Sequence, residues 1–311
     1  MSMEQNTQPR GTLWGEPCAC DENTEATSES GAIYAVTMSD KEFARLSEFI
    51  RSTCGIKLPL AKKTMLEGRL RKRLRTLRLQ SFGRYCDYIF SSVGSESEHV
   101  HMIDAVTTNK TDFFREPGHF DYLCDMVLPE LVRLHDVGSK KRLNVWSAAC
   151  STGEEPYTLA MVLSEFAQGC PGFQFSILGT DISTRVLEKA RLAVYEHEKV
   201  DLIPMTLRRK YLLKSREKDK GLVRITPELR ASVRFKRLNL MEDDYGIDEP
   251  VGVVFCRNVL IYFDRPTQEK LVNQLAYHLM PGGYLFVGHS ESLHGMDLPL
   301  AQTATTIYRK Q

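Results

Sequence analysis

The 311-residue sequence lacks any hydrophobic run of the roughly 18 residues that a membrane-spanning helix needs. It also lacks a charge excess, because 41 Lys and Arg nearly balance 40 Asp and Glu. A polyelectrolyte that binds nucleic acid or membranes through its overall charge is therefore excluded. Residues 1–10 are polar and contain no apolar core of a secretory signal. We therefore expect a cytoplasmic protein without membrane insertion.

Paired metal-binding or disulfide-forming cysteines are also missing. The eight cysteines include no Cys-x-x-Cys and no zinc-ligand spacing. Disulfide frameworks normally occur in shorter, secreted chains, so we predict reduced thiols. None of His119, His278 and His289 has a His or Cys neighbour at ligand spacing, which predicts structural or surface roles and no metal site.

The composition changes twice along the chain. Residues 1–36 are acidic and rich in Thr, Ser, Glu and Gly, which predicts a disordered tail that includes Cys18 and Cys20. Residues 37–107 carry helical patterns: Ser39 and Glu42 have capping-box spacing, and leucines recur at helical spacing from Leu66 to Leu77. These patterns predict a small, basic, all-α N-terminal domain.

The leucine-bearing helix carries many lysines and arginines but a single acid, Glu67. Three interpretations are open: a solvated face, a nucleic-acid site, or a docking surface for an acidic partner. Residues 60–79 contain no aromatic side chain, and the whole chain carries a charge of only +1, which argues against nucleic acid.

Residues 108–311 alternate between strand and helix patterns, which predicts an α/β domain with a doubly wound, mostly parallel sheet. The expected strands are 142–148, 173–180, 251–256 and 284–288. The expected helices are 117–135, 154–168, 184–195 and 267–279. A small antiparallel β-insertion is predicted at about 210–236, and an edge strand at 303–308.

Ligands of such sheets bind beyond the carboxyl ends of the strands. The first strand is followed by a loop of small residues that matches neither GxGxxG nor a phosphate-cradling loop, and its two glutamates would repel a pyrophosphate. Asp181 follows the second strand, where an acid binds ribose hydroxyls, and Asn239 and Asn258 follow the next two. Each residue alone is more typical of a cap or turn. Together they fit an adenosyl ligand without a phosphate, such as S-adenosylmethionine.

Four long runs closely resemble the CheR family of bacterial chemotaxis receptor methyltransferases. They are TTNKTDFFRE at 107–116, WSAACSTGEEPY at 146–157, FCRNVLIYFD at 255–264 and GGYLFVGHSES at 282–292. They occur in the family's order, and the resemblance covers about 37–309. It implies a class I S-adenosylmethionine-dependent methyltransferase fold preceded by a small all-α domain.

The resemblance implies a protein-glutamate O-methyltransferase of chemotactic signal transduction. Such an enzyme transfers methyl groups from S-adenosyl-L-methionine to glutamates on the cytoplasmic domains of methyl-accepting chemoreceptors. The products are glutamyl methyl esters and S-adenosyl-L-homocysteine. The implied catalytic residues, near the reacting methyl, are Arg115 and Tyr262. The implied cofactor contacts are Asn109, Thr111, Arg115, Glu155, Asp181, Asn239, Leu240, Arg257 and Asn258. No catalytic base is needed, because a glutamate with a pKa near ~4.3 is already ionised at pH 7.

The resemblance favours docking of the basic helix on the acidic helical bundle of a receptor, with contacts at Arg69, Arg73 and Arg78. The insertion resembles a subdomain that in some relatives binds a peptide at the receptor's C-terminus. Its loop lacks the glycines of those relatives, so the use of a tether stays open. We expect a monomer. The alternatives are a methyltransferase for RNA or small molecules on the same fold, and a non-catalytic adaptor.

Overall fold

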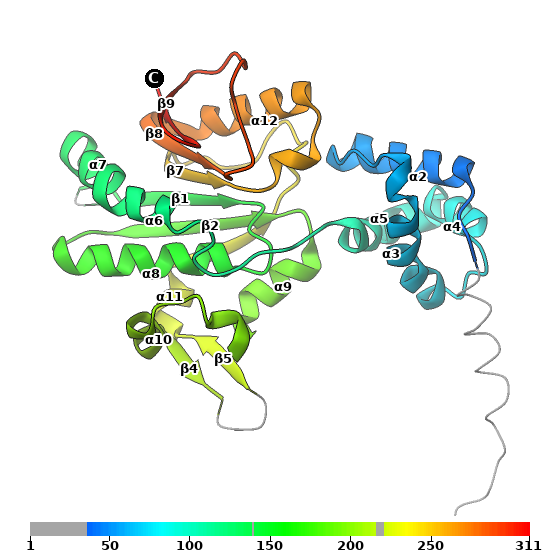
Figure 1. Cartoon of the computed structure of the whole chain (residues 1–311), viewed down its shortest axis with the longest axis horizontal. Coiled ribbons are helices and arrows are strands. Elements are labelled where there is room, and N and C mark those ends of the chain that lie inside the picture. The colour runs from blue at the N-terminus through cyan, green and yellow to red at the C-terminus, as the bar shows by residue number, and fades with distance from the viewer. Residues whose placement is uncertain (1–35, 139, 216–220) are drawn as a thin grey trace, which may run out of the picture.

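The computed structural model describes residues 36–138, 140–215 and 221–311 (Figure 1). The predicted disordered tail, with Cys18 and Cys20, therefore lies almost entirely outside the described residues. The same holds for most of the charged loop in the predicted insertion.

The N-terminal part is the predicted all-α domain. Its elements are α2 (Asp40–Cys54), η1 (Leu60–Lys62), α3 (Lys63–Thr76), α4 (Phe82–Ile89) and α5 (Ser92–Val106). The capping box is confirmed: the Ser39 hydroxyl accepts the Glu42 N–H, and the Glu42 carboxylate accepts the Ser39 N–H at 2.7 Å. The leucine pattern is confirmed as well, because Leu66, Leu70 and Leu74 are fully buried in the core of this domain.

The remaining residues form an α/β domain around a sheet that has seven strands in the described residues. The strand order is β6-β2-β1-β7-β8-β10-β9. The bounds are β1 (Leu143–Ala148), β2 (Phe175–Asp181), β6 (Val233–Arg237), β7 (Val251–Cys256), β8 (Leu279–Val287), β9 (Leu300–Ala304) and β10 (Ile307–Lys310). Strands β6, β2, β1, β7 and β8 pair in parallel, and β10 pairs antiparallel with both of its neighbours. The predicted doubly wound, mostly parallel sheet is confirmed.

Helices cover both faces of this sheet. Along β1, Val145 packs into a core formed with α7 (Leu128–His135) and α8 (Glu154–Gly169). The next residue, Trp146, packs into a core on the other face with α12 (Arg265–His278). Residues of β7 are buried along their whole length for this reason, as expected for a strand covered on both sides.

Two further segments complete the helices. The predicted helix 117–135 consists of α6 (Gly118–Tyr122), a π-helical turn η2 (Leu123–Val127) and α7. Helix α9 (Thr184–Leu192) stops earlier than predicted, because Ala193 takes a left-handed conformation with φ 54° and its N–H bonds to the Lys189 carbonyl.

The antiparallel insertion differs from the prediction at both ends. It is a three-stranded sheet ordered β3-β5-β4, formed by β3 (Val194–Glu196), β4 (Leu212–Lys214) and β5 (Leu222–Ile225). Two short helices, η3 (His197–Val200) and α10 (Met205–Tyr211), lie between β3 and β4. A third, α11 (Pro227–Ala231), follows β5. The insertion therefore covers 194–225 rather than 210–236, and β6 belongs to the large sheet.

The predicted edge strand at 303–308 is a hairpin instead. Strands β9 and β10 meet at a turn in which Thr306 has φ 60°, and β9 forms the edge. No helix of the described residues is long and apolar enough to cross a lipid bilayer.

The two domains touch at the carboxyl ends of the parallel strands (Figure 1). The Lys57 N–H donates to the Tyr262 carbonyl at 3.1 Å, and the Asn239 amide donates to the Thr53 carbonyl at 2.7 Å. Gly55 has φ 72°, and a Cβ there would lie 2.6 Å from the sulfur of Met241. The loop after α2 is therefore packed tightly against the strand-end loops.

Candidate active site

One pocket at these strand ends collects every residue predicted for the cofactor and for catalysis. It is lined by Asn109, Thr111, Arg115, Glu155, Asp181, Asn239, Leu240, Arg257, Asn258 and Tyr262. The all-α domain supplies another wall through Cys54 and residues 56–59, and the connection 107–112 supplies a third. The predicted site residues, which come from distant parts of the sequence, are thus brought together.

The loop between β1 and α8 approaches the pocket with three left-handed residues, Ala149, Ser151 and Gly153. A Cβ at Gly153 would lie 2.9 Å from the Ala190 Cβ, so the tight turn requires glycine there. The turn points the Ser151 N–H at the Asp181 carboxylate, 2.9 Å away. Small side chains in this loop leave the backbone open to close approach by a ligand.

Asp181 is buried at the end of β2 and oriented by backbone groups. One carboxylate oxygen accepts the Ser151 N–H and the other accepts the Ser183 N–H at 2.9 Å. Burial raises the pKa of Asp181, and the two backbone N–H groups act in the opposite direction. Each carboxylate oxygen has a second lone pair, so the group can still accept hydrogen bonds from the two hydroxyls of a ribose.

Arg257 lies buried between two carboxylates. Its guanidinium is 3.1 Å from Glu116 and 3.4 Å from Glu155, and it also donates to the Arg115 carbonyl. The Ser147 hydroxyl donates to Glu155 at 2.7 Å. Burial raises the pKa of Glu155, whereas Arg257 lowers it. The pair of acids around one arginine leaves net negative charge, which suits the ammonium group of an amino-acid moiety.

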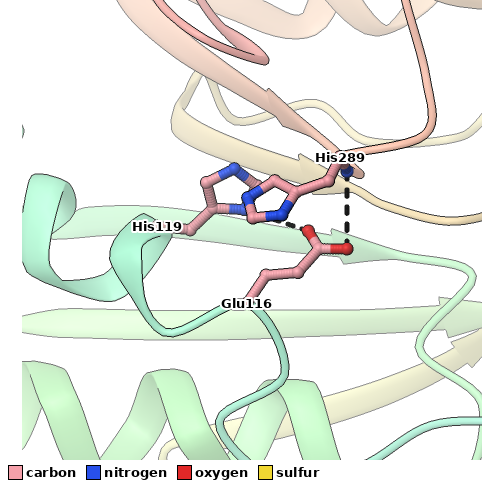
Figure 2. Close-up of side chains that lie close together, drawn as sticks. All are labelled: Glu116, His119 and His289. Carbon is pink, nitrogen blue, oxygen red and sulfur yellow. Dashed lines mark hydrogen bonds and ion pairs between the residues drawn. The ribbon is translucent and has the colours of Figure 1, made fainter.

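Glu116 is joined by His119 and His289 (Figure 2). The His289 N–H donates to Glu116 at 3.4 Å, and the His119 Nδ1 lies 3.5 Å from the other carboxylate oxygen. Two imidazoles and a carboxylate suit zinc. A divalent ion here would, however, sit beside the Arg257 guanidinium, which already contacts Glu116. We therefore interpret the cluster as a support for Glu116, which accepts from the Asn258 amide at 3.3 Å.

The two predicted catalytic residues face the same space. Arg115 is half-buried and donates to the Lys110 carbonyl at 3.2 Å. Tyr262, also half-buried, closes the 3-10 turn η5 (Leu260–Tyr262), and its carbonyl anchors the all-α domain. A guanidinium that is only partly buried can orient an incoming carboxylate without being neutralised by an internal acid.

The three arginines predicted to contact a receptor have different surroundings. Arg69 lines the pocket and donates to the Val106 carbonyl and to Thr108. Arg73 makes two hydrogen bonds to the buried Glu98, at 2.6 and 2.9 Å. Arg78 is exposed just after α3, with φ 54°. The first two are thus engaged within the protein, and the third is exposed to solvent.

Two carboxylates that contact the site residue Asn258 were missed by the sequence reasoning: Glu116 and Glu291. Both lie inside runs that carry the family resemblance, and this was the available signal. Neither follows a strand directly, and their partners, such as Asn258, come from distant segments.

Comparisons with known proteins identify the family of both domains. The family model "CheR methyltransferase, SAM binding domain" matches residues 109–309, and "CheR methyltransferase, all-alpha domain" matches residues 41–107. A chemotaxis protein methyltransferase of Escherichia coli K12 is 39% identical over 274 residues, covering 88% of this chain and 92% of the relative. One from Klebsiella aerogenes is 38% identical over 288 residues, covering 91% and 96%. A third, from Borreliella burgdorferi, is 36% identical over 261 residues, covering 84% and 91%.

Both domains and their order are thus accounted for by a single family. The chain belongs to the CheR methyltransferase family, with an all-α domain followed by a domain that binds S-adenosylmethionine.

Proposed function

We propose that this protein methylates glutamate side chains on the cytoplasmic domains of chemoreceptors, forming glutamyl methyl esters. The observation that carries the proposal is the convergence of the predicted cofactor residues with Arg115 and Tyr262 in one pocket. The same pocket is lined by Lys57, Lys62 and Arg69 of the all-α domain, cations that would attract an anionic acceptor. The relatives' shared name, chemotaxis protein methyltransferase, supports a substrate in that pathway.

The residues of the pocket fit S-adenosylmethionine. Asp181 would hold the ribose hydroxyls, Glu155 the ammonium group, and the small-residue loop at 149–153 would lie against the ligand. Leu240 supplies a buried apolar contact beside these polar groups. When bound, the cofactor supplies a methyl group activated by a positively charged sulfur.

The chain's own residues mainly have to align the reactants. A glutamate carboxylate is ionised at neutral pH, so its oxygen forms the new bond to the methyl carbon as the carbon–sulfur bond breaks. The electron pair of that bond stays on sulfur, and no proton moves. Arg115 would aim the carboxylate, Tyr262 would limit its approach, and the all-α domain would exclude water.

Receptor docking is the finer part of the proposal. Among the three predicted arginines, Arg78 is exposed at the end of the basic helix, so we assign it the direct contact with an acidic receptor helix. The small sheet leaves β3 and β4 as edge strands. Leu213 within β4 is exposed, and so is Leu192 at the end of α9. An extended receptor tether could add to such an edge. We propose that the protein acts as a monomer in the cytoplasm.

The test is transfer of labelled methyl from S-adenosylmethionine to a receptor cytoplasmic fragment, followed by release in mild alkali. We expect labelled methanol, because glutamyl esters hydrolyse under these conditions. Asp181→Asn is the matched control, which should lose both cofactor binding and transfer. Alkali-stable label, or cofactor binding without transfer to any receptor fragment, would contradict the proposal. Stable label on RNA would favour the alternative substrate.

A further inference from the structure

Glu291 is a buried carboxylate in the loop after β8, and only 6% of it is exposed. One oxygen accepts the N–H groups of Asn258 at 2.8 Å and of Gly288 at 2.6 Å. The other accepts the Leu260 N–H at 2.7 Å. Its partners are thus backbone N–H groups rather than a lysine or an arginine.

Two of these N–H groups belong to the loop that follows β7. In this loop Asn258 has φ 59°, a left-handed conformation that costs a non-glycine residue on the order of 1 kcal/mol or more. The chain then turns through η5 to Tyr262. The turn directs the N–H groups of Asn258 and Leu260 away from the sheet. Among the hydrogen bonds of the described residues, Glu291 alone accepts these two N–H groups.

The two loops also interlock sterically. A Cβ at Gly288 would lie 2.4 Å from the side-chain nitrogen of Asn258, so the loop of Glu291 can approach only because this position is glycine. The backbone of the same loop closes on itself, since the Glu291 N–H donates to the Gly288 carbonyl at 2.9 Å. Glu291 is therefore held in place from its own side as well.

We propose that Glu291 is a positioning residue that fixes Asn258 and Tyr262 in the geometry needed to bind the cofactor and align the methyl acceptor. Glu291 does not line the pocket, so it acts through these two residues. The inference rests on the proposed function only in the roles given to Asn258 and Tyr262. The hydrogen bonds that carry it stand without that function.

Glu291→Gln tests the proposal because glutamine keeps the shape but replaces one oxygen by an N–H₂ group. At least one backbone N–H then faces a donor and loses its partner. We expect amide hydrogen exchange in the segment 257–263 to rise about tenfold or more, and S-adenosylhomocysteine to bind about tenfold more weakly by calorimetry. The kcat for methyl transfer should fall further than KM for the receptor fragment rises.

Glu67→Gln is the matched control. Glu67 is also buried, at 7% exposed, and accepts a backbone N–H, that of Met38, at 2.8 Å. It lies in α3 and does not line the pocket. The control should leave both exchange in 257–263 and S-adenosylhomocysteine affinity at wild-type values.

The proposal is overturned if Glu291→Gln matches the control in local exchange and in affinity. Should the glutamine variant be too unstable to purify, Glu291→Asp keeps the charge but is too short to reach all three N–H groups. It should show a smaller rise in exchange over the same segment, and wild-type exchange there would overturn the proposal. Wild-type protein that binds S-adenosylhomocysteine yet methylates no receptor would contradict the proposed function alone.

Discussion

At the scale of single residues, His119 shows how burial fixes a protonation state. The imidazole is buried, with its Nε2 2.9 Å from the Thr306 hydroxyl and its Nδ1 3.5 Å from the Glu116 carboxylate. Burial, followed by the charge of Arg257, lowers the pKa of His119 to about 4.

This lowered pKa predicts a loss of stability in acid. Between pH 6.5 and pH 4 the unfolded chain binds a proton at this residue and the folded chain does not, so the free energy of unfolding falls as the pH falls. The contribution reaches about 3 kcal/mol by pH 4. For His119→Gln, the free energy of unfolding measured with urea should depend less steeply on pH between pH 7 and pH 4.5 than it does for the wild-type protein. An identical slope in both proteins would refute the assignment.

The sequence could predict some site residues and not others for a physical reason. Asp181 ends β2 and Asn258 lies two residues beyond the end of β7, so the geometry of a parallel sheet places them at the ligand edge. Glu116 and Glu291 act through contacts with Asn258, which lies 142 and 33 residues away from them along the chain. A single sequence without a fold carries no signal for such pairs apart from membership in a known motif.

At the scale of elements, the basic helix α3 has two kinds of arginine. Arg73, with 17% of its side chain exposed, pairs with Glu98, which is 2% exposed. Glu98 also accepts the Tyr85 hydroxyl at 2.9 Å, so the pair ties α3 to α4 and α5. The positive charge of α3 is therefore partly neutralised inside the domain and is not all available at the surface.

We expect Arg73→Ala to lower the free energy of unfolding by about 3 kcal/mol, because it leaves the Glu98 carboxylate buried without its cation. Arg78→Ala should change stability by less than about 0.5 kcal/mol and should weaken methylation of a receptor fragment. Chemical denaturation and methyl transfer assays on both variants separate the two roles. Equal effects of the variants on stability would argue against this division.

The limits of sequence patterns are also visible at this scale. Helices such as α8 and α12 have long periodic patterns and could be predicted within two residues of their bounds. The three-residue strand β3 could not, because Ala193 ends α9 through a backbone conformation that its side chain does not announce. The β9–β10 hairpin was missed because an alternating pattern does not reveal the turn at Thr306.

At the scale of the whole molecule, the pocket depends on contact between two domains. Gly55 is the tightest point of that contact, with φ 72° and with Met241 and Phe263 at 2.6 Å from a hypothetical Cβ. A side chain here is strained by its backbone conformation and also pushes the domains apart.

Gly55→Ala should therefore weaken binding of S-adenosylhomocysteine about tenfold, a loss of roughly 1.4 kcal/mol, as measured by calorimetry. Gly68→Ala in α3 is the matched control, because no atom lies within 4 Å of a Cβ there and alanine favours the helix. The control should bind normally and be slightly more stable. Normal binding by Gly55→Ala would show that the pocket tolerates separation of its walls.

The connection between the domains, residues 107–112, forms neither helix nor strand, and all of it lines the pocket. A cofactor bound in the pocket would therefore cover the backbone that joins the two domains. A cofactor that occupies the pocket would therefore also shield the backbone of residues 107–112 from proteolytic cleavage.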